Sequence, residues 1–426
     1  MQTIPHTETF DSTLAFLQNG YEFISSRCRQ LDSDIFRTRI MLRPVYCVTG
    51  ADAAQMFYEP GRFTRVGAMP PTTLSLLQDH GSVLTLDDEE HARRKEMFMA
   101  LMGPSRLAEM VELFEAEWSR RLAQWRQRGR IRLQDEVEEV LCASVCRWAG
   151  IELDERRTHL LTLELRAMIE GAGSVGPRNW NANLLRQRTE HWARELIRKA
   201  RQQADHWPHT PLQVIARHTG PRGHIPDIRT AAVELLNLLR PVVAVGRYIA
   251  YIAHALHRRP DLTARMRAGD QELAAVFVQE VRRYYPFFPV VGGIAREDFS
   301  WREYRFSRGD WLLLDLHGTN HDPRLWSHPD QFHPEQFATW NVSPFTFVPQ
   351  GGGRFSSGHR CAGEWLTIEL LKSALRMLLG MDYRVPPQDL RIPLSRMPAG
   401  IRSRFIVEQV GSAEKMERVK GIEPSS

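Results

Sequence analysis

One cysteine of the chain stands in a setting that could make it a metal ligand. Cys361 follows the glycine-rich stretch "QGGGRFSSGHR" and comes directly before residues 362–379, whose apolar spacing predicts a helix closed by Gly380. Unpaired N–H groups in the first turn of a helix favour a thiolate over a thiol. We therefore expect a thiolate beside a loop whose glycines admit a flat, bulky ligand, as in the thiolate ligation of haem iron. For a lone cysteine, the alternative is a small buried apolar side chain.

A second candidate functional segment is residues 234–256, "ELLNLLRPVVAVGRYIAYIAHAL", whose apolar spacing predicts one long helix. Arg240 and Pro241 interrupt its apolar run. The neighbours of Arg240 at helical spacing are nearly all apolar, so we expect this side chain to point inward, where an unpaired charge is costly; the alternative is a side chain that reaches the surface from the helix flank. Glu234 is six positions away, so the residues favour a ligand carboxylate, held through two parallel hydrogen bonds. Pro241 is expected to open the helix locally.

The apolar patterning of the sequence predicts a mainly helical chain with minor sheet at both ends, and these elements must position the residues named above. Residues 36–49 alternate as strands do, and a helix-like segment follows them. Residues 290–316 form a second extended region with a turn at Arg308 and Gly309, and the apolar spacing from residue 90 to about residue 199 is helical.

The composition bounds the class of protein. The 426 residues are 42% hydrophobic and 25% charged, which is typical of a soluble globular protein. The net charge of +5 comes from dispersed arginines, so we expect no nucleic-acid partner. The N-terminus has no signal-peptide pattern and no run is apolar enough to span a membrane, so the chain is expected to be cytoplasmic, without a transmembrane segment. Five scattered cysteines argue against a disulfide framework.

The cysteine loop resembles that of the cytochrome P450 superfamily, the haem-thiolate oxygenases, whose loop reads Phe-x-x-Gly-x-(Arg/His)-x-Cys-x-Gly. The matching residues are His359, Cys361 and Gly363, and the departures are Arg354 for the phenylalanine and Ser357 for the glycine. The longer loop with "GHRCAGEW" is similar to that of the fatty-acid peroxygenase branch. The resemblance implies haem b with an axial thiolate from Cys361 and with His359 among its contacts.

The resemblance covers roughly residues 10–410 and implies a mainly α fold, the cytochrome P450 fold, in which a large helical domain carries small β-sheets near its N- and C-terminal parts. We expect residues 1–411 to form a single haem-thiolate catalytic domain. Residues 412–426 are expected to be a disordered tail, because they have no apolar period.

The resemblance also implies roles in the long helix. Members that activate dioxygen carry an acid and an alcohol there, and residues 234–256 contain no such pair. In the peroxygenase branch, a fatty-acid carboxylate bound to the arginine stands in for it and acts as general acid and base on hydrogen peroxide. Arg240 and Pro241 are thus the implied catalytic residues, with a long-chain fatty acid and hydrogen peroxide as partners and no obligatory reductase.

Anchoring the carboxylate at Arg240 places the alpha and beta carbons nearest the iron, so hydroxylation there is the expected reaction. Oxidative decarboxylation to a terminal alkene is the alternative product. Leu84 stands where family members usually carry Gln or His, with His associated with decarboxylation, so the ratio stays open. Phe287 and Phe288 are candidates for the substrate pocket or, equally, for plain core. A reductase-dependent monooxygenase and a non-catalytic haem or lipid-binding protein are the other functions left open.

Glu280 and Arg283 lie three positions apart in "QEVRRYYPFFP", on one face of a predicted helix. Alone, such a pair is usually a surface salt bridge. In this order before the cysteine, it matches the Glu-x-x-Arg that braces the proximal side of the family's haem. Gln336 replaces the arginine that normally completes this triad, and an amide lacks the bidentate guanidinium, so the brace is expected to be weaker.

Basic residues in two further stretches match the family's contacts to the haem propionates. His91 and Lys95, with Arg94 beside them, open the predicted helix in "DDEEHARRKEMFMALM". Arg65 in "FTRVGAMP" occupies a second such position in the peroxygenase branch. Without the resemblance, each of them would be read as an ordinary surface charge.

Overall fold

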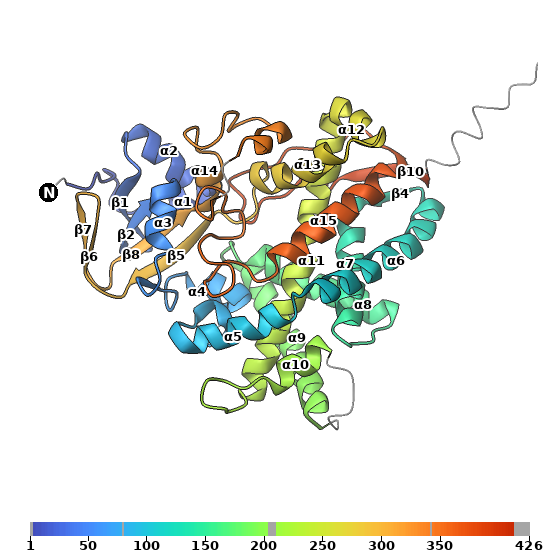
Figure 1. Cartoon of the computed structure of the whole chain (residues 1–426), viewed down its shortest axis with the longest axis horizontal. Coiled ribbons are helices and arrows are strands. Elements are labelled where there is room, and N and C mark those ends of the chain that lie inside the picture. The colour runs from blue at the N-terminus through green and yellow to red at the C-terminus, as the bar shows by residue number, and fades with distance from the viewer. Residues whose placement is uncertain (1–2, 79–80, 203–209, 341–342, 413–426) are drawn as a thin grey trace, which may run out of the picture.

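The long helix predicted from residues 234–256 runs through the middle of the molecule (Figure 1). The computed structural model describes residues 3–78, 81–202, 210–340 and 343–412. In it, α11 extends from Ile228 to Arg258 and is mostly buried. Asp227 caps its N-terminus, where the carboxylate accepts a hydrogen bond from the backbone N–H of Thr230 at 2.7 Å. The prediction of one long helix is confirmed.

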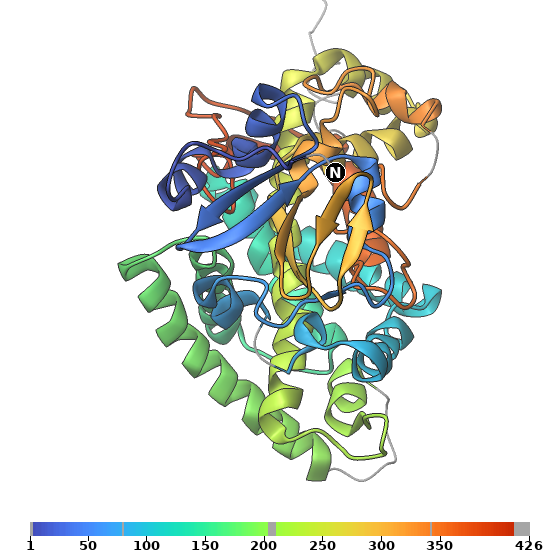
Figure 2. The ribbon, with the colours of Figure 1, turned by 90° about the vertical axis from the view of Figure 1, so that its left-hand side faces the viewer.

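Other helices surround α11, and the long α9 forms one edge of the molecule (Figure 2). The larger helices are α5 (Asp88–Ala100), α6 (Pro104–Arg128), α7 (Leu133–Trp148), α8 (Glu155–Gly171), α9 (Pro177–Gln202), α13 (Gln271–Tyr284) and α15 (Glu364–Leu379). The shorter ones are α1 (Thr13–Asn19), α2 (Phe23–Gln30), α3 (Ala51–Phe57), α4 (Pro71–Thr73), α10 (Pro211–Arg217), α12 (Pro260–Arg267) and α14 (Leu316–Asn320). Single turns of other helix types are η1 (Gly20–Glu22), η2 (Leu74–Gln78), η3 (Val83–Thr85) and η4 (Pro334–Ala338). None of the helices in the described ranges has a stretch both long and apolar enough to cross a bilayer.

The main sheet joins the two extended regions that the alternation predicted. Its strand order is β1-β2-β8-β5-β3, in which only the β2–β8 pair is parallel. The bounds are β1 (Ile35–Ile40), β2 (Arg43–Val48), β3 (Phe63–Thr64), β5 (Val290–Ala295) and β8 (Trp311–Asp315). The predicted turn leads into β8, with Gly309 at φ +91°. The hairpin of β6 (Phe299–Trp301) and β7 (Tyr304–Phe306) interrupts the second region and was not predicted, because each strand has only three residues.

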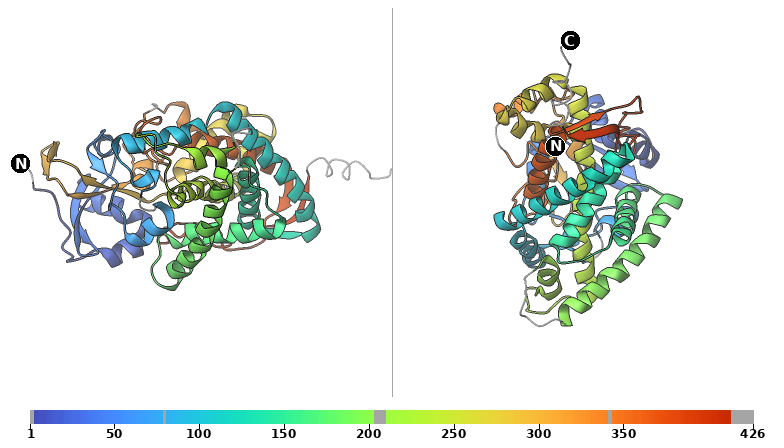
Figure 3. Two further views of the ribbon diagram at one scale, coloured as in Figure 1. Left: turned by 90° about the horizontal axis from the view of Figure 1, so that it is seen from below. Right: turned by 90° about the vertical axis from the view of Figure 1, so that its right-hand side faces the viewer.

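A second sheet, β4-β10-β9, lies at the end of the molecule far from the main sheet (Figure 3). Its strands are β4 (Arg130–Arg132), β9 (Met381–Arg384) and β10 (Ile406–Ser412). The predicted start of the tail is wrong by one residue, because Ser412 pairs with Met381 in β9 and so completes this sheet. The rest of the predicted tail, residues 413–426, lies outside the described residues. The assignment of residues 1–411 to one domain stays a prediction.

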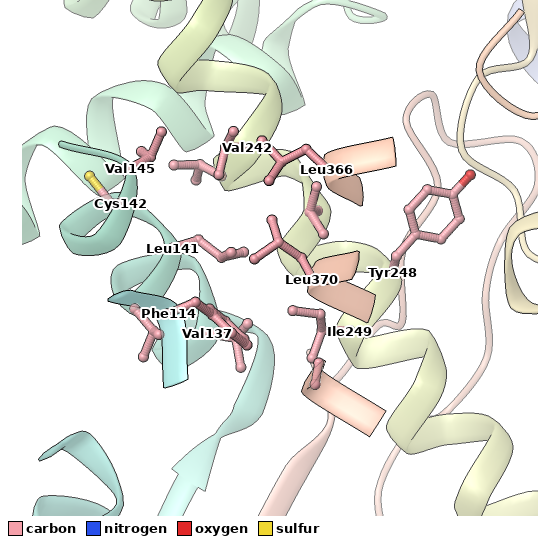
Figure 4. Close-up of a cluster of buried hydrophobic side chains, with 14 of the residues drawn as sticks. Phe114, Val137, Leu141, Cys142, Val145, Val242, Tyr248, Ile249, Leu366 and Leu370 are labelled. Carbon is pink, nitrogen blue, oxygen red and sulfur yellow. The ribbon is translucent and has the colours of Figure 1, made fainter. Parts of the chain in front are cut away.

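The core forms where α11 is packed between α7 and α15 (Figure 4). Val242 and Ile249 of α11 lie among Leu141 of α7 and Leu370 of α15, and all four are buried. Cys142 is a fully buried member of the same cluster. The packing against α7 and α15 holds α11 in place, and this fixes the depth at which its central turn lies.

Candidate active site

The glycine-rich loop before Cys361 packs closely on the ring of Tyr58. A Cβ added to Gly352 would lie 3.0 Å from Tyr58 Cε2, and one added to Gly353 would lie 2.9 Å from Tyr58 Cβ. Gly353 also has φ +78°, a conformation that glycine adopts without strain. These two glycines therefore accommodate a ring of the chain itself, and the expectation that the loop also admits a flat ligand stays a prediction.

The Cys361 thiol lies beside the side chain of Gln350, whose Nε2 donates to Sγ at 3.7 Å. Burial raises the pKa of this thiol, and Glu364 adds to the effect, while the N–H of Gly363 and the charge of Lys95 lower it. The helix start acts in the predicted direction, because the Gly363 N–H lowers the pKa, but without a metal ion the desolvation of the thiol outweighs this effect. A bound metal ion supplies the missing positive charge, since coordination deprotonates a thiol outright.

Two arginines hold the carboxylate of Glu364, the first residue of α15. Arg282 forms a buried ion pair with it, and Arg360 donates to it at 2.6 and 3.0 Å. Arg282 also donates to Gln350 Oε1 at 3.2 Å, which turns Nε2 of that amide toward Cys361. Sequence reasoning missed Gln350 and Arg282. Arg282 could have been found from the pair of adjacent arginines in "EVRRYY". Neighbouring residues of a helix cannot both face Glu280, so Arg282 needs another partner.

The predicted brace on α13 is fully buried. Arg283 Nε and NH2 donate to the two carboxylate oxygens of Glu280 at 2.8 and 2.7 Å, and neither side chain has exposed surface. Arg283 also donates to the carbonyl of Asn320 at 3.0 Å. Gln336 occupies the third position of the triad, and its Nε2 reaches both Glu280 oxygens at 3.2 and 3.1 Å. The amide keeps the geometry of the triad; that it weakens the brace stays a prediction.

The residues predicted to meet the haem propionates gather at one place. The rings of His91 in α5 and His359 in the cysteine loop stack 3.9 Å apart at 14°, and Lys95 Nζ donates to the carbonyl of Arg360. Burial holds the pKa of His91 at about 4 and that of Lys95 at about 8. It also lowers the pKa of His359, whose Nε2 lies 3.1 Å from the Leu86 carbonyl oxygen. The two imidazoles are therefore neutral at pH 7.

Arg65 approaches the same cluster from the segment after β3 and is 8% exposed. Its NH1 donates to the Gly292 carbonyl at 2.6 Å, and its guanidinium lies 4.4 Å from the centre of the Phe57 ring. Burial lowers its pKa, and the hydroxyl of Tyr58 raises it in part. No carboxylate of the described part of the chain lies within ion-pair distance of Arg65. Arg65 and Lys95 thus form a desolvated cationic site, and such a site suits a carboxylate ligand.

Arg94, grouped with His91 and Lys95 by sequence, has a different partner. Its NH1 forms an ion pair of 2.5 Å with Glu234 of α11, and both side chains are buried. Glu234 also accepts from the backbone N–H of Val83 at 2.8 Å and from Asn237 Nδ2 at 3.1 Å. Burial raises the pKa of the Glu234 carboxyl, while the charge of Arg94 lowers it. Arg94 therefore joins α5 to α11; the sequence grouped it with the propionate contacts because its distant partner could not be seen.

Arg240 is buried in α11, with 3% of its surface exposed. Its NH2 donates to the Leu77 carbonyl and, at 2.8 Å, to Asn237 Oδ1. Pro241 beside it is exposed, although the helix around it is mostly buried. The predicted opening of the helix at Pro241 is not seen: α11 continues through this turn, since its packing on both sides outweighs the loss of one backbone hydrogen bond.

The remaining predicted pocket residues differ in exposure. Phe287 stacks on Tyr248 of α11, with ring centres 4.2 Å apart at 7°, and Phe288 packs edge-on against Phe287 at 4.9 Å. Phe288 is 43% exposed, and Leu84 in η3 is 37% exposed. Phe287 thus extends the core beside α11, whereas Phe288 and Leu84 present apolar surface.

Comparison with known protein sequences gives matches to cytochromes P450. A family model for cytochrome P450 matches residues 254–397. Cytochrome P450 3A14 of Cavia porcellus is 22% identical over 188 residues, and the chain spans only 37% of its length. The putative cytochrome P450 138 of Mycobacterium bovis is 25% identical over 384 residues, which are 82% of this chain and 83% of that protein.

Solved structures extend the likeness to nearly the whole chain. A variant of cytochrome P450SP alpha (CYP152B1) is 41% identical with a TM-score of 0.92, over 94% of this chain and 99% of that chain. Cytochrome P450EX alpha (CYP152N1) with myristic acid is 37% identical, with a TM-score of 0.92, over 97% and 100%. A variant of cytochrome P450 OleT in complex with arachidonic acid is 31% identical, with a TM-score of 0.93, over 97% and 99%.

This chain belongs to the cytochrome P450 family, and the mainly α fold predicted from the resemblance is confirmed. Within the family, its similarity to the CYP152 structures confirms the assignment to the fatty-acid peroxygenase branch. The chain is accordingly a haem-thiolate oxidoreductase.

Proposed function

We propose that this protein uses hydrogen peroxide to hydroxylate long-chain fatty acids at the alpha or beta carbon, without an obligatory reductase. The observation that carries the proposal is the buried Arg240 next to Pro241, in a helix that has no acid-alcohol pair. Relatives solved with myristic acid and with arachidonic acid support fatty acids as the class of substrate.

The residues of the site fit haem b. Cys361 lies on the loop ahead of α15, and the desolvation that raises the pKa of its thiol is offset when a metal ion binds the sulfur. The Gln350 amide, fixed by Arg282, adds a hydrogen bond to the sulfur. The desolvated cations Arg65 and Lys95 suit the two propionate groups. When bound, haem supplies the iron at which the O–O bond of peroxide is cleaved and an oxygen atom is transferred to the substrate.

Arg240 binds and orients the fatty acid in this proposal. Its guanidinium has a fixed orientation, because Leu77 and Asn237 both accept hydrogen bonds from NH2. A carboxylate bound to this buried cation is held by charge-assisted hydrogen bonds in position and in angle. The alpha and beta carbons then lie nearest the reacting oxygen, and positioning of this kind lowers the barrier by confining the reacting atoms.

The substrate carboxylate also performs proton transfer. Its oxygen accepts a proton from hydrogen peroxide and returns it to the departing oxygen, as general acid and base. Arg240 keeps this carboxylate ionised before peroxide binds, because a nearby positive charge favours the charged form of an acid. Leu84 and Phe288 contribute apolar surface and no proton donor, so they exclude water from the alkyl chain.

The test is mass analysis of the products that purified haem-loaded protein makes from a panel of long-chain fatty acids. One arm supplies hydrogen peroxide, and a second supplies oxygen with reduced ferredoxin. We expect 2- or 3-hydroxy acids in the peroxide arm, and a terminal alkene would indicate decarboxylation instead. Product only in the ferredoxin arm would establish a reductase-dependent monooxygenase, and binding without product in either arm would establish a non-catalytic protein.

A further inference from the structure

A buried hydrogen-bond network joins Arg282 of α13 to the sulfur of Cys361. Arg282 NH2 donates to Gln350 Oε1 at 3.2 Å, and Gln350 Nε2 donates to Cys361 Sγ at 3.7 Å. The exposed fractions of Arg282 and Gln350 are 2% and 8%. Little water lies between such groups to screen their charges, so a change at one of them is felt strongly by the next.

The neighbours of Gln350 determine which way its amide points. Arg282 only donates hydrogen bonds, so the amide oxygen must face it. The hydroxyl of Thr367 donates to the Gly363 carbonyl at 3.0 Å and therefore accepts from Gln350 Nε2, at 3.2 Å. The second hydrogen of Nε2 is then left for the Cys361 sulfur. A rotated amide would set its NH2 group against the guanidinium and its oxygen against a thiolate, and both contacts would be repulsive.

Arg282 itself has a fixed orientation. Its NH1 donates to Gln279 Oε1 at 2.5 Å, and its NH2 forms a buried ion pair with Glu364. Arg360 donates to the same carboxylate at 2.6 and 3.0 Å, so Glu364 keeps one partner when either arginine is removed. Within the described part of the chain, Arg282 donates to Gln350 and Arg360 does not.

A hydrogen bond to the sulfur changes how strongly a thiolate donates to iron. When haem iron accepts an electron, the negative charge shared by the iron and its thiolate ligand increases. A hydrogen-bond donor at the sulfur stabilises this charge, so it favours the ferrous state and raises the reduction potential. The orientation of the Gln350 amide therefore matters for the electronic properties of the iron.

We propose that Arg282 is a positioning residue that raises the reduction potential of the haem iron, by holding the Gln350 amide as a hydrogen-bond donor to the Cys361 sulfur. It thereby limits the electron density that the thiolate supplies to the iron. The adjacent Arg283 has no such role, because it is bound to Glu280 in the brace. The role of Arg282 depends only on the haem-thiolate class of the chain, and not on the substrate or on how the substrate is bound.

The first test is the reduction potential of the haem-loaded protein without substrate, measured by spectroelectrochemical titration. Gln350→Met removes the donor and should shift the equilibrium between the ferric and ferrous states about tenfold toward ferric, which corresponds to about 59 mV. Arg282→Met frees the amide to turn and should give a shift of about fivefold in the same direction. Arg360→Met is the matched control, because it removes the other positive charge from Glu364 and leaves the amide in place; its shift should stay below about twofold. Equal shifts for Arg282→Met and Arg360→Met would overturn the proposal.

Two further variants separate the positioning of the amide from the charge of the arginine. In the double variant Arg282→Met with Gln350→Met, the ferric–ferrous equilibrium should stay within about twofold of that in Gln350→Met, because Arg282 has no amide left to hold. Two single shifts that add in full would mean that Arg282 acts by its charge alone, and would overturn the proposal.

Arg282→Lys keeps the ion pair with Glu364 and should fold where the methionine variant does not. It lacks the planar guanidinium that Gln279 holds in place, so the equilibrium should still shift about twofold toward ferric. No shift would mean that a positive charge is sufficient, which contradicts a positioning role. Haem content and thiolate ligation, both read from the absorption spectrum, should be equal in all variants.

Discussion

Two buried arginines, Arg283 of α13 and Arg240 of α11, stand in the same relation to the side chain three positions before them. Arg283 follows Glu280, which accepts hydrogen bonds from it at 2.8 and 2.7 Å. Arg240 follows Asn237, whose amide oxygen accepts one at 2.8 Å. A carboxylate at this position neutralises the guanidinium, whereas an amide fixes its orientation without adding a negative charge.

The difference shows how one residue type serves two purposes on similar helices. The glutamate makes Arg283 part of the architecture, where its carbonyl contacts hold the segment that contains Gln336. The asparagine makes Arg240 an oriented cation, which is what a substrate carboxylate requires. The substitutions below test this difference in stability, in substrate binding and in haem binding.

The largest effect is expected from removing the structural arginine. Arg283→Met leaves Glu280 buried without its bidentate partner, which should cost about 3–5 kcal/mol of stability. Urea unfolding of the haem-loaded protein, followed by circular dichroism and haem absorbance, measures this loss. Arg93→Met, at an exposed pair, should unfold like the unaltered protein. Equal unfolding curves for the two variants would show that the brace does not stabilise the fold.

The second largest effect is expected from giving Arg240 a carboxylate neighbour like that of Arg283, and it should appear in fatty-acid binding. Asn237→Asp has almost the shape of asparagine and places a carboxylate beside Arg240, so KM for a fatty acid should rise about a hundredfold. Asn237→Ala removes the contact without adding a charge and should raise KM only a fewfold. Steady-state kinetics with peroxide measures both. Similar KM values for the two variants would mean that charge at this position is unimportant.

Arg65 resembles Arg240 in this comparison, because Arg65 also donates to a neutral acceptor, the carbonyl of Gly292. Arg65→Met should therefore fold normally and bind haem less well, with haem loss about tenfold faster, as for one charge-assisted hydrogen bond. Transfer of haem to an excess of apomyoglobin measures the rate. An unchanged rate combined with a lower melting temperature would make Arg65 structural instead.

The smallest effect is expected at Gln336. Gln336→Arg restores the guanidinium of the usual triad at a position where the amide already lies 3.2 and 3.1 Å from the Glu280 oxygens. We expect a gain of about 1 kcal/mol in the free energy of unfolding. A loss of stability would show that the site has no room for a second guanidinium beside Arg283.

The elements that carry the site were predictable from local pattern, whereas their pairings were not. Apolar spacing indicated α11 and α15, and alternation indicated β1 and β2. The sheet that joins β4 to β10 brings residues 130–132 against residues 406–408, and no local signal marks such a distant pairing. Strands of three residues, as in the hairpin of β6 and β7, are likewise too short to show a period.

The same limit applies to the site. Cys361, Glu280, Arg283 and Arg240 have residue types and spacings that suggest chemistry from the sequence alone. The contacts of several other residues are fixed only by the fold: these residues are Tyr58, Gln350, Arg282 and the pair of Arg94 with Glu234. The desolvation that opposes the helix start at Cys361 likewise depends on the fold, because it comes from the segments packed around the thiol.

The measurement that tests the central claim most directly compares a fatty acid with the fatty alcohol of equal chain length, in the unaltered protein and in Arg240→Met. If Arg240 binds the carboxylate, the unaltered protein should prefer the acid in kcat/KM by about a hundredfold or more, and the variant should lose most of this preference. Haem content and melting temperature serve as controls. A variant that folds, binds haem and keeps the full preference for the acid would contradict the account.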